Sequence, residues 1–438
     1  MRDHLHLLQT KRFYPLFITQ FLGAFNDNAF KNAFLIWFTY DVASYRGLDA
    51  PMMVTLAAGL FILPFFLFSA LAGQVADAYE KSWLTQKIKL VEVILMLGCA
   101  VCFFLKSIEG LLVLLCMMGV QSTFFGPIKY SLLPEHLEEE ELIAGNGFIE
   151  GGTFLAILLG TLFGGLIITA AQGVELLSLC VVLFSVIGYL ASRLIPAAPI
   201  GDTQLTIGWN IAKETWYIVG HARKEPTVWL AIIGISWFWL IGATFLTQFP
   251  TYTKQVIGGN EHIVTLFLTL FSIGIGVGSM WCNRLLKGEI NGRLVPYGAL
   301  GMSIAIFCFT LASYGYMAER EAYMAASMAE VGFTQFFHIG ISSSIIIVSL
   351  LGLSVCAGLY IVPLYAIMQH RSEGQFLARI IAANNVMNAL FMVCASIAML
   401  LLFAVGFTVT EILLTVGIVN IPVFFLVRRV VIRRLGDA

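Results

Sequence analysis

Long apolar runs follow one another along almost the whole chain. A helix needs about 20 predominantly apolar residues to cross a hydrocarbon core of about 30 Å. Only 12% of the residues are charged and 59% are hydrophobic, against about 25% charged in a soluble domain. The pattern predicts an all-α membrane protein with twelve transmembrane helices, at 13–40, 52–76, 86–106, 110–133, 142–171, 174–195, 226–254, 261–286, 293–315, 340–369, 375–404 and 407–432.

The longest polar interruption separates the sixth run from the seventh. It predicts an N-terminal six-helix bundle at 1–195, a cytoplasmic linker at 196–225 and a C-terminal six-helix bundle at 226–438. The linker contains LTIGWNIAKETWYIVGHARKE, whose apolar and basic residues suit a helix lying on the membrane surface. A plain tether is the alternative, and the sequence leaves both open.

The distribution of Lys and Arg predicts the orientation. If the N-terminus is cytoplasmic, most of the 25 Lys and Arg, Lys89 among them, fall on the cytoplasmic side. The exceptions are Arg46, Lys106, Lys254 and Arg320 outside, and Lys31 within the first run. Cytoplasmic loops of membrane proteins carry such an excess of positive charge. We therefore expect a multi-pass protein of the bacterial inner membrane with both termini in the cytoplasm.

Several ionisable and amide side chains interrupt the apolar runs. Asp27, Asn28 and Lys31 share a face of the first predicted helix, with Gln20 and Gly23 before them, and Asp27 lies about 20 Å along it. Charges at this depth are costly and indicate function. Asp27 and Lys31 could instead form a local ion pair. Asn26 and Asn32 lie toward the edges of the face, where bonds to neighbouring helices are the simpler explanation.

Two further segments carry candidate substrate contacts. Asn146 and Glu150 share a face of the fifth predicted helix, beside a run of glycines, and Lys129 follows Pro127 in the fourth. Glu150 could alternatively make a structural hydrogen bond to another helix. Lys129 could extend to the membrane interface, as long cationic side chains do.

The two halves repeat weak features at equivalent places. GAF at 23–25 matches GAT at 242–244, Pro127 matches Pro363, and Asn146 matches Asn384 or Asn385. Such repeats are typical of transporters in which two bundles rock around a central cavity. Asn384, Asn385 and Asn388 are also compatible with simple bonding between helices.

The loop after the second run reads GQVADAYEKSWL, with Gly73, Asp77 and Lys81 at intervals of four residues. It resembles the major facilitator motif GxxxD followed by basic residues. Glycine permits close helix approach, and the carboxylate can bond across the gap between bundles, so we predict a gating role for these three residues. The equivalent loop GSMWCNRLLKG has Cys282 in place of the acid.

Three segments make a more specific resemblance: QFLGAFNDNAFKN at 20–32, FFGPIKYSLLPEHL at 124–137 and LIAGNGFIEGGTFLAILLGT at 142–161. Together with GQVAD they resemble the bacterial lysophospholipid transporter family of the major facilitator superfamily. The resemblance implies the major facilitator fold and movement of lysophospholipids, such as lysophosphatidylethanolamine, from the outer to the inner leaflet of the inner membrane. Reacylation would follow, by a phospholipid acyltransferase that is a separate partner or a fused module. Gln248 is uncharged where some family members carry arginine.

Other classes of function fit less well. A proton-coupled exporter or facilitator of small amphiphilic solutes or drugs is the alternative, with Asp27 and Glu150 carrying protons. An enzyme is not expected, because the chain has neither an HxxxxD nor a GxxxxGKS motif. The net charge of −1 argues against nucleic acid. We expect no cofactor or metal, since the CxxC at Cys99 and Cys102 has no second ligand cluster.

Overall fold

The protein is a bundle of long helices. The computed structural model describes residues 4–38, 50–324 and 331–434. Twelve helices of 20 residues or more occur in this part of the chain: α1 (Tyr14–Trp37), α3 (Ala50–Ala78), α4 (Lys81–Phe104), α5 (Ile108–His136), α6 (Leu142–Ile168), α7 (Gly173–Ser192), α9 (Pro226–Tyr252), α10 (Glu261–Leu286), α11 (Leu294–Met324), α13 (Ile341–Arg371), α14 (Leu377–Ala404) and α15 (Val409–Arg434). Two short helices, α8 (Ile211–Ala222) and α12 (Phe333–His338), lie between them.

Ten of these helices are long and apolar enough to cross a membrane by composition alone. The other two among the described helices are α1 and α4, which carry polar and charged side chains inside their apolar sequences. Both nevertheless pack among the spanning helices, α1 against α6 and α7 and α4 against α7 and α5. The prediction of an all-α membrane protein is therefore confirmed, and each of the twelve predicted spans corresponds to a long helix in the described part of the chain.

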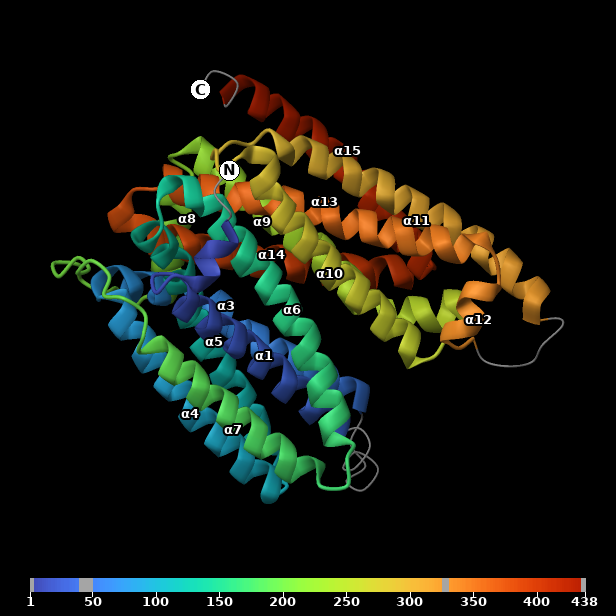
Figure 1. Cartoon of the computed structure of the whole chain (residues 1–438), viewed down its shortest axis with the longest axis horizontal. Coiled ribbons are helices and arrows are strands. Elements are labelled where there is room, and N and C mark those ends of the chain that lie inside the picture. The colour runs from blue at the N-terminus through green and yellow to red at the C-terminus, as the bar shows by residue number, and fades with distance from the viewer. Residues whose placement is uncertain (1–3, 39–49, 325–330, 435–438) are drawn as a thin grey trace.

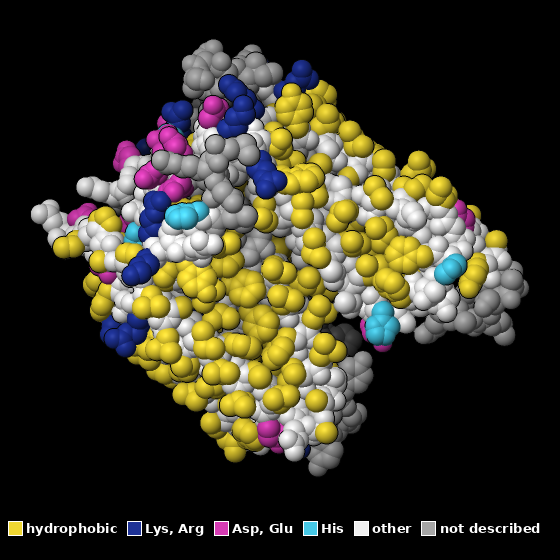
Figure 2. All heavy atoms as spheres, viewed as in Figure 1, with side chains coloured by type: hydrophobic (Ala, Val, Ile, Leu, Met, Phe, Trp, Pro, Cys, Tyr) yellow, Lys and Arg dark blue, Asp and Glu magenta, His cyan; other side chains and the backbone are white. Residues whose placement is uncertain are grey.

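The helices form two six-helix bundles (Figure 1). Helices α1 and α3–α7 make one bundle, and α9–α11 with α13–α15 make the other. The bundles meet at the end where α8 lies and diverge toward the end where α12 lies (Figure 1). We call these the linker end and the far end. On the face shown in Figure 2, most Lys and Arg side chains gather at the linker end, and hydrophobic side chains cover most of the remaining surface.

Some predicted boundaries differ from the structure. Helix α4 begins at Lys81, five residues before the predicted start, because the Glu80 side chain accepts hydrogen bonds from the backbone N–H groups of Ser82 and Trp83. Helix α11 continues to Met324, beyond the predicted end at 315. The linker does contain a helix, α8, which Asn210 caps and which packs against α14 and α3.

Glycines bring α1 and α6 into close contact. A Cβ atom on Gly160 would lie 2.3 Å from the carbonyl oxygen of Phe25, and one on Gly164 would lie 2.2 Å from that of Ala29. Small residues drive helix association in membranes because apolar side chains gain little there over contact with lipid. This contact fixes α1, and with it Asp27, within the first bundle.

Replacing Gly164 by valine should therefore destabilise the protein. We expect a loss of about 1–3 kcal/mol, the usual cost of overpacking, seen as a lower midpoint of thermal unfolding in detergent. Gly59→Val is the matched control, because no atom lies within 4 Å of a Cβ built on Gly59. Equal stability of the two variants would contradict the importance of the α1–α6 contact.

Candidate functional site

Asp77 joins the two bundles at the linker end. Its carboxylate accepts hydrogen bonds from the backbone N–H groups of Ala378 and Arg379, at the first turn of α14, and from Arg379 Nε at 2.8 Å. The Asp77 side chain is 1% exposed and that of Arg379 is 9% exposed. The carboxylate thus meets both an arginine and the positive end of a helix dipole across the bundle interface.

Gly73 makes this approach possible. A Cβ atom there would lie 2.7 Å from Ala382 Cβ and 2.9 Å from Arg379 Cα, so a larger residue would force α3 and α14 apart. Lys81 does not cross the interface, because its Nζ pairs with Glu135 Oε1 at 2.5 Å within the first bundle. Of the three predicted gating residues, two lie at the contact between bundles and the third supports the loop beside it.

A second layer of polar contacts joins the bundles through α6 and α13. Asn146 of α6 donates to Gln369 Oε1 of α13 at 2.6 Å, and Gln369 Nε2 donates back to Asn146 Oδ1 at 3.0 Å. Gln369 also donates to the backbone carbonyl of Tyr130 at 3.2 Å. Asn146, predicted to bind substrate, is thus engaged in a reciprocal amide bridge between bundles.

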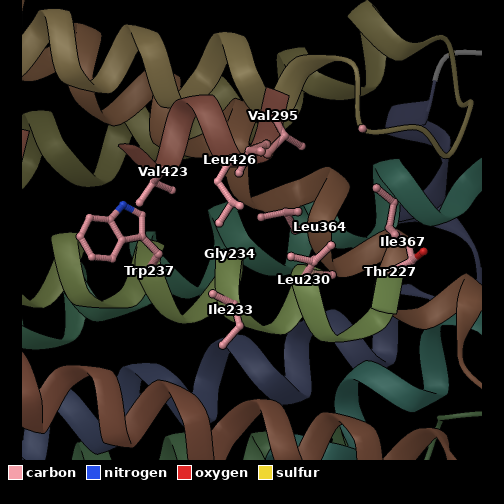
Figure 3. A pocket seen from close by; sticks show the side chains of 13 residues that line it. Thr227, Leu230, Ile233, Gly234, Trp237, Val295, Leu364, Ile367, Val423 and Leu426 are labelled. Carbon is pink, nitrogen blue, oxygen red and sulfur yellow. The ribbon is translucent and has the colours of Figure 1, made fainter. Parts of the chain in front are cut away.

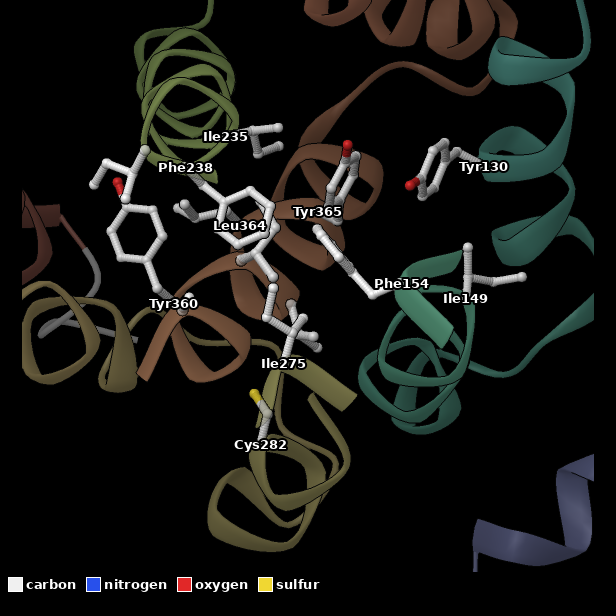
Figure 4. Close-up of a cluster of buried hydrophobic side chains, with 14 of the residues drawn as sticks. Tyr130, Ile149, Phe154, Ile235, Phe238, Ile275, Cys282, Tyr360, Leu364 and Tyr365 are labelled. Atoms are coloured by element: carbon white, nitrogen blue, oxygen red, sulfur yellow. The ribbon is translucent and has the colours of Figure 1, made fainter. Parts of the chain in front are cut away.

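The third layer is aromatic. The rings of Tyr130 from α5 and Tyr365 from α13 stack with centroids 4.5 Å apart (Figure 4). The hydroxyl of Tyr130 donates to Glu150, which is fully buried, and Lys129 Nζ lies 4.8 Å from the centroid of the Tyr130 ring. Glu150 therefore holds one half of the stacked pair. This matches the structural hydrogen bond that the sequence left open as its alternative role.

Phenylalanine and tryptophan side chains continue this contact toward the middle of the helices. The ring centroid of Phe154 on α6 lies 5.9 Å from that of Phe238 and 5.8 Å from that of Trp239, and both of these residues are on α9. These inter-bundle contacts all lie between the linker end and the middle of the helices. At the far end, Figure 2 shows the surface hollowed between the two bundles. We call the three layers, from Asp77 to Tyr365, the linker-end gate.

Asp27 lies beyond the gate, toward the far end. Its carboxylate is 9% exposed and accepts a hydrogen bond of 2.6 Å from Ser122 of α5. Asn28 and Lys31 are partly exposed, and Lys31 Nζ lies 3.3 Å from Asn28 Oδ1 and 5.3 Å from the Phe61 ring centroid. Lys31 is thus hydrogen-bonded to Asn28, whereas Asp27 is hydrogen-bonded to Ser122. These bonds replace the Asp27–Lys31 ion pair that the sequence left open.

An ion pair that the sequence analysis missed lies behind Asp27. Lys89 and Glu92 of α4 are fully buried and bonded to each other, and Gln121 donates to Glu92 at 3.0 Å. A Cβ on Gly23 would lie 2.6 Å from Lys89 Nζ, so the absence of a side chain at Gly23 leaves room for the lysine beside α1. The sequence counted Lys89 among the charges of the cytoplasmic side, and the structure places its side chain inside the bundle, eight residues after the start of α4.

Three further asparagines of α1 and α14 bond neighbouring helices. Asn26 donates to the carbonyl of Val181 on α7, and Asn32 donates to that of Thr161 on α6. Asn388 accepts from Ser236 on α9 at 2.8 Å. The expectation that asparagines away from the polar face of α1 bond helices together is confirmed for Asn26 and Asn32.

The predicted substrate residues thus separate into two levels. Asp27, Asn28 and Lys31 lie on α1 beyond the gate, whereas Asn146 and Glu150 lie inside the gate and Lys129 lies beside its aromatic layer. The gate also uses residues absent from the prediction, namely Tyr130, Tyr365, Gln369 and Arg379. Within the described residues, no group of three or more His, Cys, Asp or Glu is arranged to hold a metal ion.

The linker helix reaches the gate through a stack of rings. His221 of α8 lies over Phe376 with centroids 3.8 Å apart, and the guanidinium of Arg379 lies 3.8 Å from the centroid of the same ring. Burial, with Lys224 nearby, lowers the pKa of His221 and so favours the neutral form of its ring. A neutral His221 ring avoids charge repulsion with the guanidinium of Arg379, which lies against the same Phe376 ring. This stack places α8 beside the arginine that binds Asp77.

Asp77→Asn should loosen the gate. The amide cannot balance the buried Arg379 charge, and each 1.4 kcal/mol lost from the closed state raises the open fraction about tenfold. The reporter is Ala382→Cys, because Ala382 is fully buried under Gly73 in the closed gate. We expect the thiol at this position to react with a maleimide about tenfold faster or more in the Asp77→Asn background.

The control for this experiment is Glu139→Gln, because Glu139 lies at the same end, is exposed, and only approaches His370 at 3.6 Å. Labelling of the Ala382→Cys reporter should not change when this substitution is added. An unchanged labelling rate in Asp77→Asn would show that the Asp77–Arg379 contact does not hold the gate.

Comparison with known proteins gives a consistent result. The model of the family described as Major Facilitator Superfamily matches residues 16–349. A protein named lysophospholipid transporter LplT from Enterobacter sp. (strain 638) is 25% identical over 385 residues, covering 85% of this chain and 84% of that protein. Its namesake from Escherichia coli (strain SE11) is 24% identical over 373 residues, covering 84% and 82%. The resemblance to lysophospholipid transporters seen in the sequence is confirmed.

Solved structures share the fold at low identity. The human organic anion transporter MFSD10 superposes with a TM-score of 0.73 at 12% identity, covering 98% of this chain and all of that one. A bacterial homologue of the iron transporter ferroportin in an outward-facing state has a TM-score of 0.67 at 13% identity, with 95% and 99% covered.

Proposed function

We propose that this chain, which belongs to the Major Facilitator Superfamily, moves lysophospholipids from the outer to the inner leaflet of the bacterial inner membrane by alternating access. The names of its relatives, which are transporters, support this substrate class. Reacylation of the delivered lipid would fall to a phospholipid acyltransferase acting as a separate partner or fused module.

The observation that carries the proposal is the arrangement of charge on α1. The Asp27 carboxylate, anchored by Ser122, and the Lys31 ammonium lie one helical turn apart on the far side of the closed gate. A lysophosphatidylethanolamine headgroup carries both an ammonium and a phosphate. Asp27 would accept the ammonium, and Lys31, with Asn28 beside it, would bind the phosphate.

The closed gate fits the proposed direction of movement. With the linker in the cytoplasm, as the Lys and Arg distribution predicts, the described conformation is closed inward and open outward. A lysophospholipid would enter from the outer side and bring its headgroup to Asp27. Separation of the Tyr130–Tyr365 stack, the Asn146–Gln369 bridge and the Asp77–Arg379 contact would then release it toward the inner leaflet. Lys129 and Glu150 would be exposed to the headgroup during this step.

The second candidate is proton-coupled transport of small amphiphilic solutes. It is favoured by two buried carboxylate oxygens, Asp27 Oδ1 and Glu150 Oε2, for which the described residues supply no hydrogen-bond partner. A carboxyl group in such a position can gain a proton at little structural cost. The two candidates differ in substrate and in their need for a proton gradient.

Purified protein in proteoliposomes distinguishes these candidates. We expect time-dependent uptake of radiolabelled lysophosphatidylethanolamine that persists when an uncoupler collapses the proton gradient. Absence of lysophospholipid uptake by folded protein would overturn the proposal. If the uncoupler abolishes uptake, lysophospholipid remains the substrate, and the carboxylates of Asp27 and Glu150 are assigned to proton coupling.

Asp27→Asn should reduce lysophosphatidylethanolamine uptake by at least about tenfold, because a charge-assisted bond to the ammonium is lost, worth about 1.5–3 kcal/mol. Expression and thermal stability should stay near those of the parent. Glu175→Gln is the control, since Glu175 is a carboxylate in the first turn of α7, away from the polar face of α1. Loss of folding in Asp27→Asn would instead indicate a structural role for the carboxylate.

A further inference from the structure

An apolar pocket lies within the second bundle, and none of its lining residues belongs to the gate or to the Asp27 region (Figure 3). It is bounded by four helices, with Leu230 and Gly234 from α9, Val295 from α11, Leu364 from α13 and Val423 from α15 among its walls. Thr227 supplies the only polar side chain of its lining apart from the indole of Trp237. The indole N–H is itself bonded to Asn420 at 2.7 Å, so the ring presents apolar surface to the pocket.

The lining of the pocket extends along α9 over about half the thickness of the hydrocarbon core. Figure 3 shows Thr227 and Trp237 toward opposite ends of it, and both lie on α9. Ten residues of helix span about 15 Å, which is half of a hydrocarbon core of about 30 Å. Thr227 is the second residue of α9, so the pocket occupies the half of the membrane next to the linker end. Leu426 of its lining is 50% exposed, which opens the pocket sideways.

Three exposed arginines lie close in sequence to residues that line the pocket. Gly292 and Val427 line the pocket, and each is followed by an exposed arginine, Arg293 and Arg428, with Arg429 next in sequence. Two carboxylates lie nearby. Glu225 caps α9 through the backbone of Thr227, and Glu289 approaches Arg293 at 3.9 Å with both side chains about two-thirds exposed. The arginines therefore outnumber the carboxylates at this rim.

We propose that this pocket binds one acyl chain of an anionic diacyl phospholipid from the leaflet at the linker end. The chain fills the groove from Thr227 to Trp237, the second chain stays in the bilayer beside Leu426, and the phosphate and anionic headgroup meet Arg293, Arg428 and Arg429. Basic pockets between transmembrane helices on the cytoplasmic side bind such lipids by this combination of charge and apolar surface. The site is separate from the proposed transport path and does not depend on the transported substrate.

The position of Trp237 allows a direct test. The intact protein is reconstituted into phosphatidylcholine vesicles that contain a minor fraction of either phosphatidylglycerol or phosphatidylcholine with brominated acyl chains, which quench tryptophan on contact. The Trp237 signal is the difference between the parent and Trp237→Phe, since the chain has 8 Trp. We expect at least twofold stronger quenching of this signal by brominated phosphatidylglycerol than by brominated phosphatidylcholine.

Two sets of variants separate the headgroup from the acyl chain. Replacing Arg293, Arg428 and Arg429 by glutamine should remove the preference for phosphatidylglycerol. Each arginine replaced should lower the apparent affinity for phosphatidylglycerol about fivefold. Ala231→Leu should fill the pocket, because Ala231 lines it and is 2% exposed, and should reduce quenching by both lipids. Gly242→Val is the matched control on α9, where no atom lies within 4 Å of the added Cβ.

Three results would overturn the proposal. Equal quenching by the two lipids would indicate ordinary boundary lipid, and no quenching of Trp237 would show that no acyl chain enters the pocket. Quenching by brominated lysophosphatidylethanolamine as strong as by phosphatidylglycerol would place the pocket on the transport path. Because the three arginines are exposed, their replacement should leave folding intact, which size-exclusion chromatography checks.

Discussion

The hydrocarbon core of a membrane offers no water, so a polar group inside it must find its partner within the protein. The gate and the Asp27 region both follow from this constraint. Asp77 bonds to Arg379 and two backbone N–H groups, Asn146 bonds to Gln369, and one oxygen of Glu150 bonds to Tyr130. Two of these partners, Arg379 and Gln369, lie on the other bundle. Satisfying the polar groups at the linker end therefore closes that end.

The same constraint makes the closed state reversible. Polar bridges and a ring stack join the bundles there, and each can be exchanged for contacts with water or with a headgroup when the bundles rock. The interior of the first bundle is different. Asn26, Asn32 and the Lys89–Glu92 pair bond within the same bundle, so they can stay bonded in every conformation. Asp27 is intermediate between these two sets, because one of its oxygens accepts a hydrogen bond from Ser122 in the same bundle and the other has no partner among the described residues.

The sequence anticipated much of this arrangement and missed identifiable parts. The spacing of Gly73 and Asp77 indicated a contact across the bundle gap, and the polar face of α1 indicated the region around Asp27. Lys89 and Glu92 were a detectable signal, because two opposite charges three residues apart interrupt the apolar run at 86–106. Tyr130 and Tyr365 offered no such signal, since tyrosines are common in membrane helices, and only their stacking gives them a role.

The sequence by itself determined the class of the protein, most of its apolar spans and the positions of its costly intramembrane charges. These follow from hydropathy and spacing, which are local properties, because the hydrocarbon core favours apolar segments of sufficient length and penalises charges within them. Only the tertiary structure decided which partner each polar group has. Asn146 could bind a substrate or another helix, and Asp77 could cap a loop or join two bundles. Their partners lie 223 and 302 residues away along the chain, so pairing depends on how the helices pack and not on any local pattern.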